Sequence, residues 1–406
     1  MSILRFSVAE HFVDAGAFFV DISKTCENTT IRPETQTVPW QIMWSFLQRA
    51  LIGNEPLAVS EVGSTWVGSF AEMQALSDFD TVDIAELGGP EQFVPSAWQS
   101  ASVINDSRVL SIPWMMDTRV IFYWKDILES AGVDDATAFA TPEQMNETLA
   151  KLKAASKPTF AVPTFAVTNT VHQIASWLWS TGYDFLNADA SATELTNEAA
   201  LDSIISYFEL SRYLTRKYDS LDSVLEAFET KKASVIISGP WFLKHLKLRG
   251  AGEKYLRNLG AALPPGPPFV GGSNLVVWRQ PDGRERTPEA MDWVRHLTSV
   301  ENQRRVCEAT GLLPAVQELL NEPSFANDPF RSVFASALTQ GRPMPQVPFW
   351  GAIEAELVRV FGNIWSDLKE DPRYTVRSVV LSHLEPMAKI IDDKLYCHSF
   401  APHPPA

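Results

Sequence analysis

The sequence predicts an α/β protein of two lobes, each built on a mostly parallel sheet flanked by helices. Strand-like and helix-like segments alternate through much of the chain, which is the pattern of α/β folds with largely parallel sheets. The chain has 406 residues, more than one hydrophobic core usually serves. Two segments that follow strands, residues 114–119 and 263–268, are suited to carry the chain from one lobe to the other.

The first part of the chain shows this alternation. We expect strands at residues 3–9 and 57–62, separated by a helical region at residues 40–52 in which apolar side chains recur at helical spacing. Residues 63–70 are expected to form a loop that enters a helix. Such a loop lies at the edge where an α/β sheet presents its ligands.

The next part contains two strands and two helix starts. Residues 109–113 and 120–124 are expected to be strands, and the short helix that follows at 125–131 is stopped by Gly132. Residues 141–144, Thr-Pro-Glu-Gln, open another helix, because the threonine is suited to cap it, the proline to its first position and the glutamine to the third position after the cap.

The rest of the chain is expected to be mainly helical. The remaining predicted elements are helices at residues 171–180, 199–217, 220–230 and 288–309, and strands at residues 233–238 and 275–278. The strand at 233–238 breaks at Gly239 and Pro240. Residues 263–268 contain four prolines and one glycine, which makes a stiff connector.

Composition limits the partners that the protein can have. The net charge is −15, and the 34 Lys and Arg residues are scattered rather than clustered. We therefore expect neither nucleic acid nor an anionic membrane surface as a partner. The 13 Trp residues favour carbohydrate, because a flat indole covers the face of a sugar well, although most of them should serve core packing.

Motifs of catalysis are missing from the sequence. The seven His form no H-x-x-x-H or H-E-x-x-H pair, and Cys26, Cys307 and Cys397 have no C-x-x-C spacing, so no metal site is expected. There is no phosphate-binding loop, no nucleophile elbow and no dinucleotide fingerprint after the first strand. We expect a protein without a cofactor that catalyses no reaction.

One enzymatic alternative stays open. A glycosidase needs two carboxylates that face each other across the glycosidic bond, and Glu61, Asp117 and Glu354 are available for that role.

The N-terminus bears on the location of the protein. Met1 is followed directly by the strand-like residues 3–9, without a basic region and a long apolar core, so no secretory signal peptide is expected in this sequence. The protein is then periplasmic, or extracellular and membrane-associated, if a signal peptide was removed, and cytoplasmic if Met1 is its native start. No apolar stretch reaches the roughly 18 residues of a transmembrane helix.

One segment carries a family resemblance. Residues 113–133 read Pro-Trp-Met-Met-Asp-Thr-Arg-Val-Ile-Phe-Tyr-Trp-Lys-Asp-Ile-Leu-Glu-Ser-Ala-Gly-Val. A proline that ends a strand, followed by Asp-Thr, an aromatic strand, Lys-Asp and Ala-Gly, strongly resembles the family 1 extracellular solute-binding proteins, the maltose-binding-protein-like receptors of carbohydrate ABC importers. The chain departs from the family at Trp124, where a small polar or basic residue is commoner. Four further landmarks follow in the family's order, at residues 62–70, 233–241, 271–275 and 311–315.

The resemblance implies a periplasmic-binding-protein-like fold of type II, with a hinge between its lobes and a ligand in the cleft. The first lobe is expected to contain residues 1–113 and 268–315, and the second residues 114–267 and 316–406. A monomer that closes about its hinge is the expected form.

Three tryptophans that follow turns or strand ends are candidates for stacking on a sugar. Trp241 is the strongest, because Gly239 and Pro240 force a turn directly after a strand and direct the indole toward the cleft. Trp66 and Trp350 are the other two, with core packing as the alternative for all three.

Polar candidates accompany these aromatic residues. Asp117 lies at the expected crossing between lobes and can accept hydrogen bonds from hydroxyls, or cap a turn. Glu61 lies at a strand end, and Gly271, Gly272 and Ser273 would let backbone N–H groups approach a ligand, unless the glycines serve only the turn.

Two further residues, Arg119 and His172, are interpreted as surface or structural groups.

Three functions remain. The leading hypothesis is a binding component that delivers a mono- or oligosaccharide to the permease subunits of an ABC importer, energised by a separate ATPase subunit. The second is a cytoplasmic sugar sensor that passes its closure to a signalling partner. Sequence upstream of Met1 would distinguish the two. The third is a glycosidase, which turnover of a bound oligosaccharide would reveal.

Overall fold

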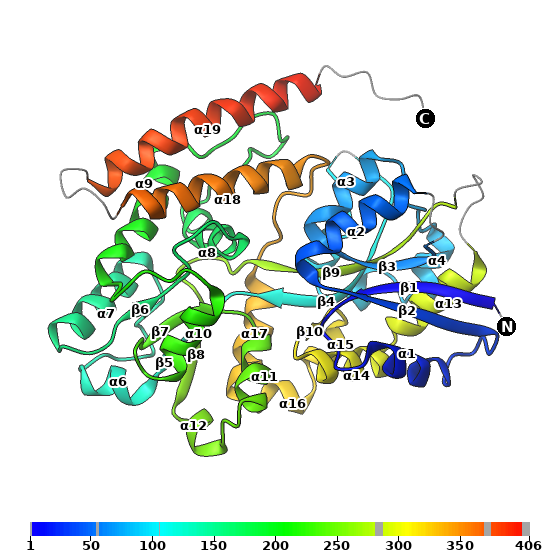
Figure 1. Ribbon diagram of the computed structural model, residues 1–406, viewed down its shortest axis with the longest axis horizontal. Helices are drawn as coiled ribbons and strands as arrows, with labels where there is room; N and C mark the ends of the chain where they lie inside the picture. The colour runs from blue at the N-terminus through cyan, green and yellow to red at the C-terminus, as the bar shows by residue number, and fades with distance from the viewer. Residues whose placement is uncertain (1, 54–56, 105, 281–286, 369–374, 400–406) are drawn as a thin grey trace.

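Two β-sheets, one in each lobe, organise the protein. The computed structural model describes residues 2–53, 57–104, 106–280, 287–368 and 375–399. Figure 1 shows the two lobes side by side, the first holding the blue N-terminal strands and the second the green helices. The predicted two-lobed α/β architecture is confirmed.

The first sheet has six strands in the order β10-β4-β9-β3-β1-β2. The strands are β1 (Ser2–Ala9), β2 (Ile31–Val38), β3 (Val59–Gly63), β4 (Ile112–Thr118), β9 (Val270–Val277) and β10 (Leu313–Pro314). β1 pairs in parallel with β2 and β3, whereas β9 is antiparallel to both β3 and β4, and β10 is antiparallel to β4.

The second sheet has four strands in the order β6-β7-β5-β8. The strands are β5 (Val120–Trp124), β6 (Phe160–Ala161), β7 (Val235–Ser238) and β8 (Leu259–Ala262). β6 and β7 are parallel, and β5 is antiparallel to both β7 and β8.

Both sheets are therefore mixed, which corrects the prediction of mostly parallel sheets. Parallel neighbours need a crossover connection, usually a helix. Here β4 continues almost directly into β5, and β8 reaches β9 through residues 263–269 without a helix. The strands that enter a sheet directly from the other lobe, β5 and β9, run antiparallel to their neighbours.

Helices cover both sheets. Those of the first lobe are α1 (Ala15–Ser23), α2 (Trp40–Ile52), η1 (Ser64–Trp66), α3 (Val67–Glu72), α4 (Thr81–Glu86), η2 (Pro90–Gln92), α5 (Pro95–Gln99), α13 (Pro288–Leu297), α14 (Val300–Thr310), α15 (Gln317–Leu320) and α16 (Pro323–Ala326). Those of the second are α6 (Lys125–Ser130), α7 (Pro142–Ala154), α8 (Thr168–Trp179), α9 (Glu198–Glu209), η3 (Leu210–Tyr213), α10 (Leu221–Glu229), α11 (Trp241–Leu248), α12 (Glu253–Arg257), α18 (Trp350–Asp367) and α19 (Val376–Ser399). α17 (Pro329–Gln340) contacts strands of both sheets.

Local sequence signals explain several helix boundaries. The Thr141 hydroxyl accepts a hydrogen bond from the Gln144 N–H at 3.2 Å, which confirms the predicted cap of α7. The single helix predicted at 288–309 is instead two, because Ser299 caps a new helix there. The helix predicted at 199–217 ends at Glu209 and is followed by η3.

The division between lobes differs from the expected one at two places. β4 extends to Thr118 within the first sheet, so the expected boundary after Pro113 falls inside a strand. α15, which begins directly after residue 316, contacts β10 and α14 and packs on the first lobe. The return to the second lobe therefore comes later than expected.

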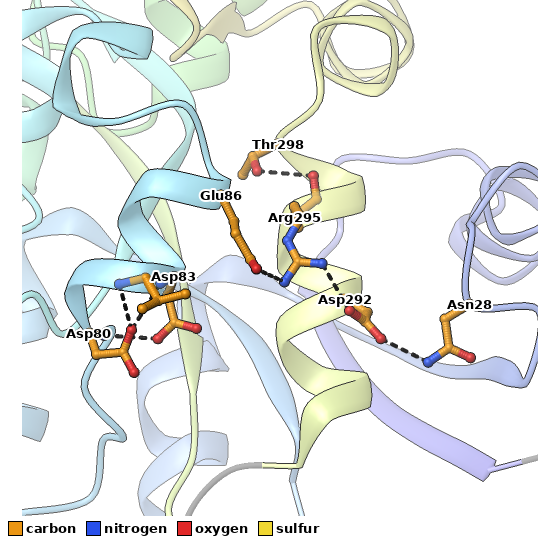
Figure 2. A network of polar contacts seen from close by, with 8 residues as sticks. Asn28, Asp80, Asp83, Glu86, Asp292, Arg295 and Thr298 are labelled. Atoms are coloured by element: carbon orange, nitrogen blue, oxygen red, sulfur yellow. Dashed lines mark hydrogen bonds and ion pairs between the residues drawn. The ribbon is translucent and has the colours of Figure 1, made fainter.

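A polar network joins three segments of the first lobe (Figure 2). Arg295 of α13 donates to Asp292 at 3.0 Å and also to Glu86 of α4. Asn28, in the loop after α1, donates to the second Asp292 oxygen at 2.8 Å. These groups are partly exposed, so the network orients the segments more than it stabilises them.

Gly272 gives a test of how β9 packs on β4. Its φ is 126°, and a Cβ atom there would lie 2.1 Å from the Met115 carbonyl oxygen. We expect Gly272→Ala to lower the free energy of unfolding by about 2 kcal/mol or more, because backbone strain and a clash with backbone coincide. Urea unfolding would measure the change.

Gly252→Ala is the matched control. Gly252 has an ordinary φ of −81°, and its added methyl group would meet nothing within 4 Å. We expect a change within about 0.5 kcal/mol for this variant. Equal losses in the two variants would contradict the role assigned to Gly272.

Candidate functional site

A cleft with a cavity of about 660 Å³ lies between the lobes. Its lining residues are His11, Trp40, Gln41, Trp44, Glu61, Gly63, Ser64, Thr65, Trp66, Asp117, Arg119, Val167, Thr168, Asn169, His172, Leu221, Trp241, Phe269, Gly272, Ser273, Thr310, Leu312 and Glu354. Both lobes and the segment that links β8 to β9 contribute. A volume of this size is typical of a small-molecule site.

An aromatic platform forms the wall of the first lobe. The rings of Trp40 and Trp66 stack with their centroids 4.8 Å apart and their planes 22° apart, and Trp44 meets Trp66 edge-on at 5.7 Å. Gly63 allows this arrangement, because a Cβ atom there would lie 2.9 Å from the Trp66 ring and 3.4 Å from that of Trp40. Trp40 keeps 37% of its surface exposed. The platform offers flat apolar area to the cavity.

Trp241 lines the cavity from the second lobe. It is the first residue of α11 and follows β7 after the turn at Gly239 and Pro240. A Cβ atom at Gly239 would lie 2.5 Å from Trp241 Nε1 and 2.6 Å from Asp117 Oδ1. The absence of a side chain at Gly239 therefore lets an indole and a carboxylate share one corner of the cavity.

The buried Arg119 and the half-buried Asp117 form an ion pair where the chain crosses between lobes. Arg119 Nη1 donates to Asp117 Oδ2 at 2.6 Å and to the Thr118 carbonyl at 2.8 Å. The other Asp117 oxygen accepts the Thr118 N–H at 2.9 Å. Arg119 is only 5% exposed, so its charge must be paired inside the protein.

His172 extends this cluster into the second lobe. Its ring stacks on Phe269 with centroids 3.8 Å apart, and its Nδ1 lies 3.3 Å from Arg119 Nη2. A guanidinium can only donate, so Nδ1 accepts, and in the neutral ring the proton is on Nε2, which is 3.6 Å from Glu354 Oε1. Burial lowers the pKa of His172 and outweighs the effect of Glu354. The neutral ring is favoured.

Glu61 and His11 form a second polar pair. Glu61 is fully buried, and its Oε2 accepts the Ala9 N–H at 2.8 Å, while Oε1 lies 3.3 Å from His11 Nε2. Burial alone would lower the pKa of His11, but the neighbouring Glu61 carboxylate raises it above its ordinary value. Glu61 therefore holds the His11 ring, which is partly exposed, at the wall of the cavity.

Several polar atoms of the lining residues have no hydrogen-bond partner within the part of the chain that the structure describes. They are Arg119 Nε, Ser273 Oγ and two carboxylate oxygens, Glu61 Oε1 and Glu354 Oε1, which still face His11 and His172 at 3.3 and 3.6 Å. Buried polar atoms without a partner cost free energy. A ligand rich in polar groups would find the most favourable contacts near these atoms.

The structure brings together most of the residues predicted for the site. Six of the eight line the cavity, namely Trp241, Trp66, Asp117, Glu61, Gly272 and Ser273. Gly271 does not line it. A Cβ atom at Gly271 would lie 2.2 Å from the Phe269 ring, so this glycine serves the packing of the crossing segment.

The structure corrects the expectation that Trp350 faces the ligand. The expected ligand-facing indole is fully buried and meets Phe185 edge-on at 5.6 Å, in the core of the second lobe. It does not line the cavity. Trp350 begins α18, and the face of that helix that carries it packs inward.

Other residues at the cavity were interpreted differently from the sequence. Arg119 and His172 were expected as surface or structural groups. Arg119 is buried beside the cavity, His172 is half-buried there, and both are paired. His11, Trp40 and Phe269 had not been predicted as site residues. The sequence could have indicated two of them as site residues. His11 follows β1 and Trp40 follows β2, and the carboxyl ends of these parallel strands meet at one edge of the sheet.

No described helix combines the length and the apolar composition that a membrane span needs. Within the described ranges, no three His, Cys, Asp or Glu side chains are grouped so that they could hold a metal ion.

Comparisons with known proteins identify the family. The model of the bacterial extracellular solute-binding proteins matches residues 18–331. A binding protein of Brucella abortus is 22% identical over 364 residues, which are 86% of this chain and 85% of that protein. The diacetylchitobiose binding protein of Streptomyces coelicolor is 22% identical over 350 residues, 82% of this chain and 78% of that protein.

A solved structure shares the fold. The sugar-binding protein MalE from Xanthomonas citri matches with a TM-score of 0.83 at 21% identity, covering 99% of this chain and 100% of that one. The two lobes and the cleft between them are thus those of a known architecture. Because the family model covers most of the sequence, this chain belongs to the bacterial extracellular solute-binding proteins.

Proposed function

We propose that this chain is the substrate-binding component of a carbohydrate ABC importer and holds a mono- or oligosaccharide in the cleft. The observation that carries the proposal is the pairing of the platform of Trp40 and Trp66 with Trp241 on the opposite lobe. A sugar presents C–H groups on its faces and hydroxyls around its edge. A cavity with aromatic walls and polar groups between them suits both.

Each polar residue has a proposed role. The Asp117 carboxylate accepts hydrogen bonds from ligand hydroxyls while Arg119 holds it in place. Gly272 and Ser273 offer backbone and hydroxyl groups near the start of β9, directly after the crossing at 263–269. Glu61 has both oxygens enclosed, so it acts on the ligand through His11 rather than directly.

Relatives support a carbohydrate as the ligand. One relative is named for diacetylchitobiose, and the structure with the same fold is a sugar-binding protein. We propose accordingly that this chain works outside the cytoplasmic membrane as a monomer, passes its sugar to the permease subunits, and catalyses no reaction on it.

Binding is proposed to act by shifting the population of open and closed lobes. A ligand can favour closure only by the contacts that it makes in the closed form and lacks in the open one. Trp241 and the platform lie on different lobes, so a sugar between them makes such contacts.

A thermal-shift screen against mono- and oligosaccharides tests the ligand class. A saccharide at one hundred times its dissociation constant should add about 2.7 kcal/mol to the free energy of unfolding. We expect a clear rise in melting temperature with one class of sugar, with polyamines and amino acids as controls. A response to a control and to no sugar would overturn the carbohydrate assignment.

Replacing Trp241 tests the site itself. We expect Trp241→Ala to weaken saccharide binding about 30-fold or more, because a stacked aromatic residue at the centre of a site contributes about 2 kcal/mol. Isothermal titration calorimetry with the saccharide found above measures the loss. Trp98→Ala is the control, since Trp98 is also partly buried but lies outside the cavity. Equal affinity in the two variants would contradict the proposed site.

The pair of His11 and Glu61 predicts a dependence of stability on pH. The pKa of His11 is raised above 6.5, so its charged form is favoured in the folded protein. The stability that it contributes is therefore fully present below about pH 6.5 and is lost as the pH rises through the folded pKa. We expect the advantage of the parent over His11→Gln in urea unfolding to shrink from pH 5 to pH 9. A difference that stays constant with pH would contradict this pairing.

A further inference from the structure

A lysine that does not line the cavity connects the two lobes at its rim. Lys244 lies on α11, three residues after Trp241, so the two side chains are neighbours along one face of the helix. Phe242 is buried and packs against Phe122 and Phe228 of the second lobe, which fixes α11 there. Lys244 itself is only partly buried.

The partner of Lys244 belongs to the first lobe. Lys244 Nζ donates a hydrogen bond to the backbone oxygen of Ala309, in the last turn of α14. α14 packs on β4 and β10 of the six-stranded sheet. The last carbonyls of a helix lack partners within the helix and form the negative end of its dipole, so an ammonium group suits this position.

Gly311 makes the contact close. It follows α14 with a φ of 78°, and a Cβ atom there would lie 2.9 Å from Lys244 Cβ and 3.1 Å from its Cδ. The apolar stem of the lysine therefore lies directly against the backbone of the other lobe. The left-handed conformation and the close approach both call for glycine.

This contact lies beside the cavity. Thr310 and Leu312, on either side of Gly311, line the cavity, as does Trp241. Neither Lys244 nor Ala309 belongs to a segment that crosses between lobes, since the chain crosses at 118–120, at 263–269 and again between α16 and α18. Opening about the crossings would therefore separate Lys244 from Ala309.

We propose that Lys244 is a clasp that holds the lobes closed without touching the ligand. It is a positioning residue, because it keeps Trp241 opposite the first lobe. A group that favours the closed form raises the population that can hold ligand, and so slows release. The part of the proposal that concerns release rests on the proposed function, whereas the part that concerns the distance between lobes does not.

The first test uses the full chain without ligand. Lys244→Met keeps an apolar stem and removes the donor, and Lys247→Met on the exposed face of the same helix is the matched control. We expect small-angle X-ray scattering to give a larger radius of gyration for Lys244→Met than for the parent, and a parent-like value for Lys247→Met. Thermal melting checks that each variant folds, and Lys244→Gln is a second variant with the same expected change. Scattering curves equal to that of the parent for both Lys244 variants would overturn the clasp.

The second test measures release of the saccharide that gives the largest thermal shift. We expect stopped-flow fluorescence to show release about tenfold faster from Lys244→Met, the effect of one lost charge-assisted hydrogen bond. Association should change by less than roughly threefold. Lys244→Arg, which restores a cationic donor, should recover most of the slow release. Parent-like release from Lys244→Met would overturn the proposed effect on release. If no saccharide binds, the proposed function fails, and the scattering experiment still decides on the clasp.

Discussion

The buried charge of Arg119 constrains the whole junction between the lobes. A guanidinium that is 5% exposed must find partners inside the protein, because a buried charge without a partner costs several kcal/mol. It finds them in the Asp117 carboxylate and the Thr118 carbonyl, within the same short crossing. The next contact is His172 in the second lobe. The geometry of the crossing is thus set by electrostatics as much as by apolar packing.

The same junction ties the crossings at 118–120 and 263–269 to each other and so shapes the cleft. The Thr118 hydroxyl donates to the Phe269 carbonyl at 2.7 Å, and Thr118 pairs with Val270 in the register of β4 and β9. His172 of α8 stacks on Phe269, so the crossing at 263–269 is also in contact with α8. The cavity is lined by this polar cluster, to which both lobes contribute, and by aromatic side chains of both lobes. Movement about this cluster would change the distance between the aromatic side chains of the two lobes.

The sequence was sufficient for features that depend on local pattern, and less so for those that depend on packing. Apolar runs located β1, β3, β5 and β7. The edge strand β2 was not predicted, because polar side chains such as Glu34 and Gln36 interrupt its apolar pattern. The direction of strands within each sheet is a tertiary property that periodicity does not contain. The burial of Trp350 likewise depends on which face of α18 packs inward.

Position relative to strand ends separates the tryptophans better than their number does. Trp40 comes two residues after β2, Trp66 three after β3, and Trp241 three after β7, and all three line the cavity. Trp350 follows no strand in this way and belongs to the core. The reason is geometric, since the carboxyl ends of parallel strands in each sheet open toward the ligand crevice. An indole placed just beyond such an end lines the cleft while its backbone stays within its own lobe. The position of these tryptophans in the candidate site therefore follows from where the strands end, and the missed strand β2 also explains why Trp40 was missed.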